Sequence, residues 1–115
     1  MPLPSYEDFK VKRQAYLEAK DAAINKAHHT YAEAVYSMFE KGLNNGEREF
    51  DDFTLRKSVY KPYGLYWFRL LEEKCIKEGW TINVPNGVST FITPYEFELI
   101  HKQERSWLTR KLKGW

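Results

Sequence analysis

The sequence predicts a mainly α-helical domain that carries one small two-stranded antiparallel hairpin, an α+β fold. Three observations lead to this fold class. The first forty residues hold seven alanines and no proline after Pro4. A second amphipathic segment is bounded by Pro62 and Gly79, and a Pro-Asn-Gly turn at 85–87 separates two short strand-like runs. The expected order is helix, short helix, helix, β-hairpin and helix, and 115 residues fit a single domain over 1–115.

The first segment, residues 5–42, is expected to be a long N-terminal helix that is either continuous or broken. Ser5 is a suitable N-cap, and Gly42 followed by Asn44-Asn45-Gly46 ends the segment. An apolar stripe recurs at helical spacing through Phe9, Tyr16, Ala19, Ala23, Ala27, Tyr31, Ala34 and Met38.

Length is the difficulty with one continuous helix over this segment. Such a rod would be roughly 55 Å long, whereas a compact domain of this size has a radius of gyration near ~13 to 14 Å. We therefore favour a break at His28-His29-Thr30, where Thr30 to Glu33 matches a capping box. The alternative is an unbroken helix whose small-residue stripe packs on a second chain, which would make a homodimer.

Residues 51–92 are expected to form a helix-turn-helix followed by a hairpin. Asp51 or Asp52 caps a short helix that reaches about Val59, and a better-defined helix runs from Pro62 to Glu78. Its apolar side gathers Gly64, Trp67, Phe68, Leu71 and Cys75, with Leu70 and Ile76 widening the arc.

The hairpin is expected over residues 80–92, and its turn determines the register. A three-residue loop, Pro85-Asn86-Gly87, places Pro85 where a type I turn accepts proline and Gly87 at a bulge position. This register pairs Val84 with Val88, Ile82 with Thr90 and Trp80 with Ile92. Residues 94–113 then form a basic C-terminal helix that begins at Thr93-Pro94-Tyr95-Glu96, a cap, a first-turn proline and a capping-box glutamate.

Catalytic motifs are absent from the sequence. There is no glycine-rich phosphate loop, no Gly-x-Ser-x-Gly and no Cys-x-x-Cys. His28 and His29 project about 100° apart on a helix and cannot share a metal ion. Helix capping accounts for Asp51 and Asp52, and Cys75 is expected to be a buried, inert thiol. We expect a non-enzymatic protein without a cofactor or metal.

Charge is distributed unevenly around a formal net charge of +2. Residues 21–53 carry three basic and seven acidic groups, whereas residues 54–115 carry eleven basic and six acidic groups. The chain is therefore expected to have an acidic middle and a basic end.

The stretch from Phe50 to Ile92 resembles a winged-helix domain in the order of its elements. Phe68-Arg69-Leu70-Leu71-Glu72-Glu73 through Gly79 is similar to a recognition helix, and the run from Val84 to Ile92 is similar to a wing. The resemblance implies DNA contact through the 62–78 helix and the wing tip. The charges oppose this, because the wing tip has no Lys or Arg and Glu72 and Glu73 accompany Arg69.

Aromatic residues make up 17% of the chain, more than a core of this size hides. We therefore expect a small protein-binding regulator or inhibitor that acts through an aromatic and basic surface, the profile of a phage or mobile-element accessory protein. The expected binding residues are Lys57, Lys61, Tyr63, Tyr66, Arg69, Arg105, Trp107 and Arg110. The alternative is a nucleic-acid-binding protein that uses the winged-helix-like segment and the basic C-terminal helix.

The sequence gives no sign of a membrane partner. No apolar run approaches the ~18 to 20 residues that cross a bilayer, and the N-terminus lacks the features of a secretory signal. We expect a cytoplasmic protein.

Overall fold

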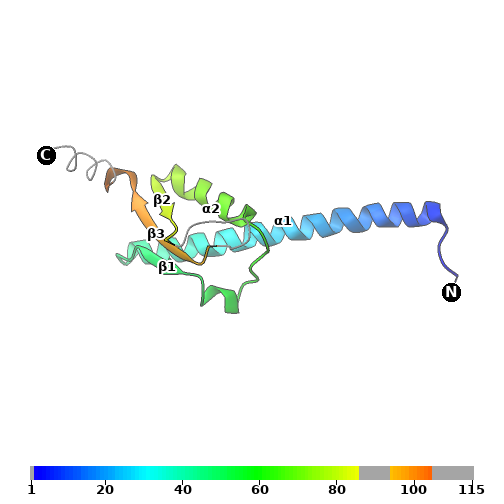
Figure 1. The fold of residues 1–115 in the computed structure, drawn as a ribbon, viewed down its shortest axis with the longest axis horizontal. Coiled ribbons are helices and arrows are strands. Elements are labelled where there is room, and N and C mark those ends of the chain that lie inside the picture. Colours follow the sequence, from blue (N-terminus) through cyan, green and yellow to red (C-terminus); the bar gives the residue numbers. More distant parts are fainter. Residues whose placement is uncertain (1, 86–93, 105–115) are drawn as a thin grey trace.

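One long helix, α1 (Tyr6–Asn44), spans most of the molecule (Figure 1). The computed structural model describes residues 2–85 and 94–104. Ser5 caps the helix as expected, because its hydroxyl oxygen accepts a hydrogen bond from the Asp8 amide at 3.3 Å. The expected break at His28-His29-Thr30 is wrong, since α1 continues through all three residues.

Only the second half of α1 is covered by the rest of the chain. The side of α1 that carries His28, Tyr31, Val35 and Phe39 packs against the body of the protein, whereas residues 2–26 are exposed throughout. The molecule therefore measures 79 × 28 × 24 Å, and its radius of gyration is 20.2 Å. Because the first half of α1 projects from the body, the helix does not have to break to fit the radius of gyration of a compact domain.

The connection between α1 and the second long helix contains less helix than the sequence suggests. Strand β1 (Glu49–Asp51) comes first, and the short helix expected up to Val59 is reduced to a 3₁₀ turn, η1 (Leu55–Lys57). Asp52 does not cap this turn with its side chain, which points into the protein instead.

Helix α2 (Tyr66–Lys77) begins four residues later than expected from Pro62. Gly64 has a φ of +100°, a left-handed conformation that cannot be part of a right-handed helix, so the helix starts after it. The expected C-terminal stop is confirmed, because Gly79 has a φ of +86°. Trp67, Phe68, Leu71 and Cys75 are buried as expected, but Ile76 is exposed.

The sheet has three antiparallel strands in the order β1-β3-β2. Its central strand, β3 (Glu96–His101), lies where the sequence predicts the start of the C-terminal helix, so this part of the prediction is wrong. Apolar and acidic residues alternate along this segment, and this alternation favours a strand over the helix that the capping residues at 93–96 indicate. Phe97 and Leu99 point into the core, while Glu96 and Glu98 point outwards. The expected helical residues beyond Glu104 lie outside the described part of the chain.

Strand β2 (Trp80–Asn83) pairs with β3, with Trp80 opposite His101 and Ile82 opposite Leu99. This ladder differs from the predicted tight hairpin, whose second strand (88–92) and turn glycine lie outside the described residues. The predicted inward face of β2 is nevertheless confirmed. Ile82 is buried, and Trp80 and Val84 pack against the core.

The core lies where the second half of α1, α2 and the sheet meet (Figure 1). Trp67 is at its centre, completely buried, with its ring centroid 4.8 Å from that of Tyr31 in an edge-on arrangement. The other buried members are Ala32, Val35, Phe39, Phe68, Leu71, Cys75, Ile82, Phe97 and Leu99. Six of the eleven buried core residues have an aromatic or sulfur-bearing side chain. The core therefore buries part of the aromatic residues that make up 17% of the chain.

Candidate functional site

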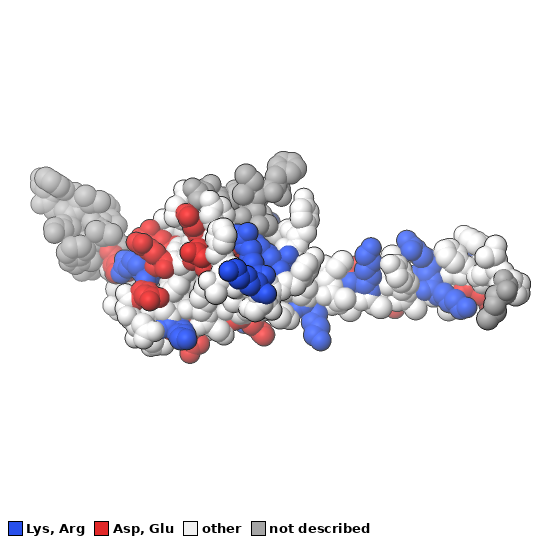
Figure 2. Space-filling view, turned by 90° about the horizontal axis from the view of Figure 1, so that it is seen from below, with Lys and Arg blue, Asp and Glu red and all other residues white. Residues whose placement is uncertain are grey.

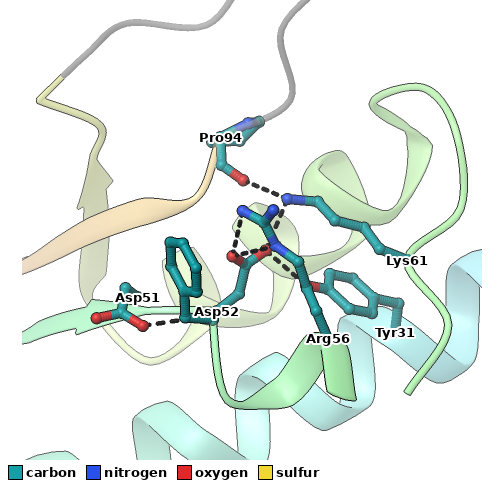
Figure 3. A network of polar contacts seen from close by, with 7 residues as sticks. Tyr31, Asp51, Asp52, Arg56, Lys61 and Pro94 are labelled. Carbon is teal, nitrogen blue, oxygen red and sulfur yellow. Dashed lines mark hydrogen bonds and ion pairs between the residues drawn. The ribbon is translucent and has the colours of Figure 1, made fainter. Parts of the chain in front are cut away.

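A buried carboxylate, Asp52, anchors the segment that leads from β1 to α2 (Figure 3). Its Oδ2 accepts hydrogen bonds from the Tyr31 hydroxyl at 2.5 Å and from the Lys61 ammonium at 2.6 Å. Its Oδ1 accepts from Arg56 Nε at 2.9 Å and lies 2.8 Å from Arg56 Nη2. Lys61 also donates to the Pro94 carbonyl at 2.9 Å, so one network joins α1, the 52–61 segment and the residues just before β3.

The network keeps Asp52 ionised. Burial on its own would raise the pKa of Asp52, but the hydrogen bonds from Lys61, Tyr31 and Arg56 outweigh it and hold the pKa below its usual value. The pKa of the Tyr31 hydroxyl is strongly raised by burial and by its hydrogen bond to Asp52, so Tyr31 remains a donor. The charged carboxylate and its donors therefore support one another.

Four aromatic side chains project from the segment that this network anchors. Phe53 is 62% exposed, Tyr60 75%, Tyr63 83% and Tyr66 46%. We call these four residues the aromatic loop surface. Three of these four side chains are tyrosines, and tyrosine is one of the residue types that dominate protein interfaces.

Basic side chains accompany the aromatic loop surface. Arg56, Lys57 and Arg69 are all exposed, and the Arg56 guanidinium lies over the Phe53 ring, 5.3 Å from its centroid. Arg56 thus links the buried network to the surface, since the same guanidinium holds Asp52.

The end of this segment is positioned by a histidine from α1. The Trp67 amide, in the first turn of α2, donates to His28 Nδ1 at 3.1 Å, so His28 takes the place of an N-cap that α2 lacks. The Tyr66 ring lies edge-on to both His28 and His29, with centroid distances of 5.4 and 5.8 Å. Burial and the neighbouring His29 lower the pKa of His28, which favours the neutral form that can accept a hydrogen bond.

The opposite charge lies on the outer face of the sheet. Glu49 is directly opposite Glu98 and Asp51 is opposite Glu96 across the β1–β3 ladder. In Figure 2 acidic side chains gather over the end of the body that holds the sheet, while basic side chains lie near its middle and along the projecting helix. The strands thus bring the acids of residues 49–51 together with two acids from the C-terminal part of the chain.

The structure places the expected binding residues in three different situations. Lys57, Tyr63, Tyr66 and Arg69 are exposed in the anchored segment and the first turns of α2. Lys61 belongs to the same segment, but its side chain is only 13% exposed and is occupied by Asp52 and Pro94. Arg105, Trp107 and Arg110 lie outside the described residues.

Sequence reasoning missed the network that anchors this surface. The sequence pattern predicts helix capping by Asp52, whereas its partner Tyr31 lies 21 residues away in α1. An aspartate followed by Arg56 and Lys61 was the signal in the sequence, but only the fold brings Tyr31 to it. The sequence pattern predicts a helix break at His28, whereas this histidine is one of two buried polar residues among the described residues.

Potential metal ligands, the Cys75 thiol and the helix lengths were compared within residues 2–85 and 94–104. In that part of the chain no group of three His, Cys, Asp or Glu side chains is arranged to hold a metal ion. Burial, with smaller contributions from Glu78 and Glu72, raises the pKa of Cys75 to about 11, so this thiol is protonated at neutral pH. In the same residues no helix is both long and apolar enough to cross a bilayer.

Comparisons with known proteins do not indicate a function, so the evidence for function comes from the fold and the aromatic loop surface. No protein-family model, curated protein or solved structure matches the chain.

Proposed function

We propose that this chain is a small non-enzymatic regulator or inhibitor that binds another protein through the aromatic loop surface. The observation that carries the proposal is the exposure of Phe53, Tyr60, Tyr63 and Tyr66 on a segment whose root is a buried ion-pair network. Aromatic side chains and arginine supply most of the energy of protein interfaces.

Anchoring matters for affinity because an ordered surface loses less conformational entropy when it binds. Asp52, with its three donors, holds the segment at one end, and the His28–Trp67 hydrogen bond holds it at the other. Arg56, Lys57 and Arg69 favour a partner with an acidic rim, and the acidic face of the sheet would help to orient the encounter.

The alternative is nucleic-acid binding through the winged-helix-like segment and the basic C-terminal residues. Its support is the exposure of Lys57 and Arg69 beside tyrosines that could stack on bases. Against it, Lys61 is committed to Asp52, and Glu72 and Glu73 share α2 with Arg69.

The test compares the wild-type chain with Tyr60→Ala/Tyr63→Ala as bait in a pull-down from a lysate of the source organism. We expect a protein that is retained at about 0.5 M salt and lost with the double variant, because an apolar interface is little weakened by screening. Ile76→Ala is the matched control, since Ile76 is a 62% exposed apolar side chain on α2 outside the aromatic loop surface. Retention by both variants would reject this surface.

A parallel titration distinguishes the alternative. Fluorescence anisotropy with a mixed-sequence duplex and a single strand is recorded between about 50 and 200 mM salt. Binding that falls steeply with salt, and that Lys57→Gln/Arg69→Gln weakens, would favour the nucleic-acid function over the protein-binding one.

A further inference from the structure

A second feature is a half-open cavity of about 420 Å³ between the C-terminal ends of α1 and α2 and the sheet. It shares no residue with the aromatic loop surface. Its floor is apolar and buried, formed by Phe39, Cys75 and Leu99. The volume suits a small ligand or one long side chain.

The rim of the cavity is negatively charged. Glu40 lies near the end of α1, and Glu78 is the residue that caps the end of α2. The carbonyl ends of two helices also converge here, and each adds a partial negative charge. No Lys or Arg is among the described residues that line the cavity.

Two aromatic rings form the walls, and one of them already holds a cation. The Lys74 ammonium lies 5.6 Å from the centroid of the Tyr36 ring. On the other wall, the Trp80 ring is buttressed edge-on by His101, with 4.9 Å between the centroids. An ammonium group placed between such rings and a carboxylate is attracted by both.

Tyr36 and Glu78 lie on the same rim of the cavity. The neighbouring Glu78 carboxylate, together with burial, raises the pKa of Tyr36 to about 12, so the hydroxyl stays protonated. A protonated hydroxyl and a carboxylate therefore lie together at the mouth of the cavity, beside the aromatic walls.

We propose that this cavity binds the ammonium end of an aliphatic amine, supplied either by a free amine or by a lysine side chain. The methylene chain lies against Phe39 and Leu99, and the ammonium group lies between Glu78, Tyr36 and Trp80. The proposal does not depend on the function of the aromatic loop surface.

The test is an NMR titration of the ¹⁵N-labelled full-length chain with n-butylammonium chloride at constant ionic strength. We expect saturating shifts at the Gly79 amide and the Trp80 indole, with a dissociation constant that is roughly millimolar for so small a ligand. n-Butanol, of the same length but neutral, should bind at least about fivefold more weakly. Equal binding of the two compounds would overturn the proposal.

Two variants should change the affinity for butylammonium in opposite directions. Glu78→Gln should weaken butylammonium binding about fivefold, whereas Glu73→Gln, an exposed carboxylate of α2 that does not line the cavity, should leave it unchanged. Lys74→Gln removes the cation that already occupies the Tyr36 ring and should strengthen binding about twofold. A gain of affinity cannot come from partial unfolding. Unchanged affinity in both Glu78→Gln and Lys74→Gln would reject the assignment.

The same titration with an acetyl-Gly-Lys-Gly-amide peptide separates the two sources of the ammonium group. Tighter binding of the peptide than of butylammonium would assign the cavity to a lysine of a partner protein. Weaker binding of the peptide would assign it to a free amine.

Discussion

Among single residues, Asp52 has the largest influence on the candidate surface. A buried carboxylate costs several kcal/mol in desolvation, and this cost is recovered only when its oxygens are well paired. Here Tyr31, Arg56 and Lys61 all donate to it. The arrangement fixes the path of the chain from β1 to α2 more than it adds to overall stability, since apolar side chains could fill the same space at no greater cost.

Replacing Asp52 by Asn should therefore destabilise the protein strongly. The variant keeps the shape of the side chain but leaves Lys61, which is mostly buried, without its counter-ion. We expect a loss of about 3 kcal/mol in the free energy of unfolding, measured by urea denaturation. Asp51→Asn is the control, because Asp51 is exposed and accepts only the Phe53 amide among the described contacts, so it should cost less than about 1 kcal/mol.

His28 should make the free energy of unfolding depend on pH below about 6.5. Its folded-state pKa is below the 6.5 of the unfolded chain, so the unfolded chain binds the proton more readily. The stabilisation is complete above pH 6.5 and is lost as the pH falls through the folded-state pKa. The slope can reach about 1.4 kcal/mol per pH unit. Asp52 contributes in the same direction but only below its unfolded value of 3.8.

The measurement is the unfolding free energy at several values between about pH 7.5 and 5. His28→Gln can still accept from the Trp67 amide but does not titrate, so its stability should fall less across this range than that of the wild type. His29→Gln removes the exposed neighbour and should keep most of the wild-type slope. A slope that follows His29 instead would show that the Trp67 contact is not the cause.

Among the elements, α1 decides how the rest of the molecule is arranged. Thr30 is an exposed residue in the interior of this helix and caps nothing. Thr30→Ala should therefore leave the melting temperature unchanged or raise it slightly, because alanine is the better helix former by about 0.5 kcal/mol. A loss of about 1 kcal/mol would instead indicate a true N-cap and a broken helix.

The elements also show which features local sequence patterns can predict. Helix α2 was recognisable because Trp67, Phe68, Leu71 and Cys75 share one face and Gly79 stops the helix, and all of this is local. Strand β3 was not recognisable, because the residues before it resemble a helix cap. Its alternating pattern, with Phe97 and Leu99 on one face, favours a strand only once β1 and β2 are known to lie on either side.

The same distinction applies to the candidate site. Exposed tyrosines could be expected from the aromatic content alone. The network that anchors them depends on residues far apart in the chain: Tyr31 and Asp52 are 21 positions apart, and Lys61 and Pro94 are 33 apart. No spacing rule predicts such contacts before the fold is known.

For the whole molecule, the projecting half of α1 accounts for the elongated shape. Residues 6–26 form about 31 Å of exposed helix, whereas most of the stability of helices in proteins comes from packing of an apolar face. One side of this helix exposes Tyr6, Phe9, Tyr16, Leu17 and Ile24. A homodimer through the unbroken helix, the alternative that the sequence leaves open, would cover that side.

Deletion of residues 2–20 should therefore leave the body intact and remove self-association. We expect an unchanged melting temperature for the truncated chain, because none of the buried core residues is lost. Sedimentation velocity should show a dimer of the full-length chain at high concentration and a monomer of the truncated one. A monomer in both cases would reject the homodimer.

The salt dependence of self-association tests the homodimer further. Lys10, Arg13 and Lys20 interrupt the apolar side of the projecting helix, and two copies would bring these like charges together. Association should then be weak, about micromolar or weaker, and should strengthen as salt screens the repulsion. Hydrogen exchange of the amides in residues 9–20 reports the same event directly, since a frayed helix exchanges quickly and a covered one slowly. Protection of these amides that rises with both protein concentration and salt would support pairing of the helices. Dissociation of the dimer on adding salt would instead show that opposite charges hold the copies together, and that a different surface is in contact.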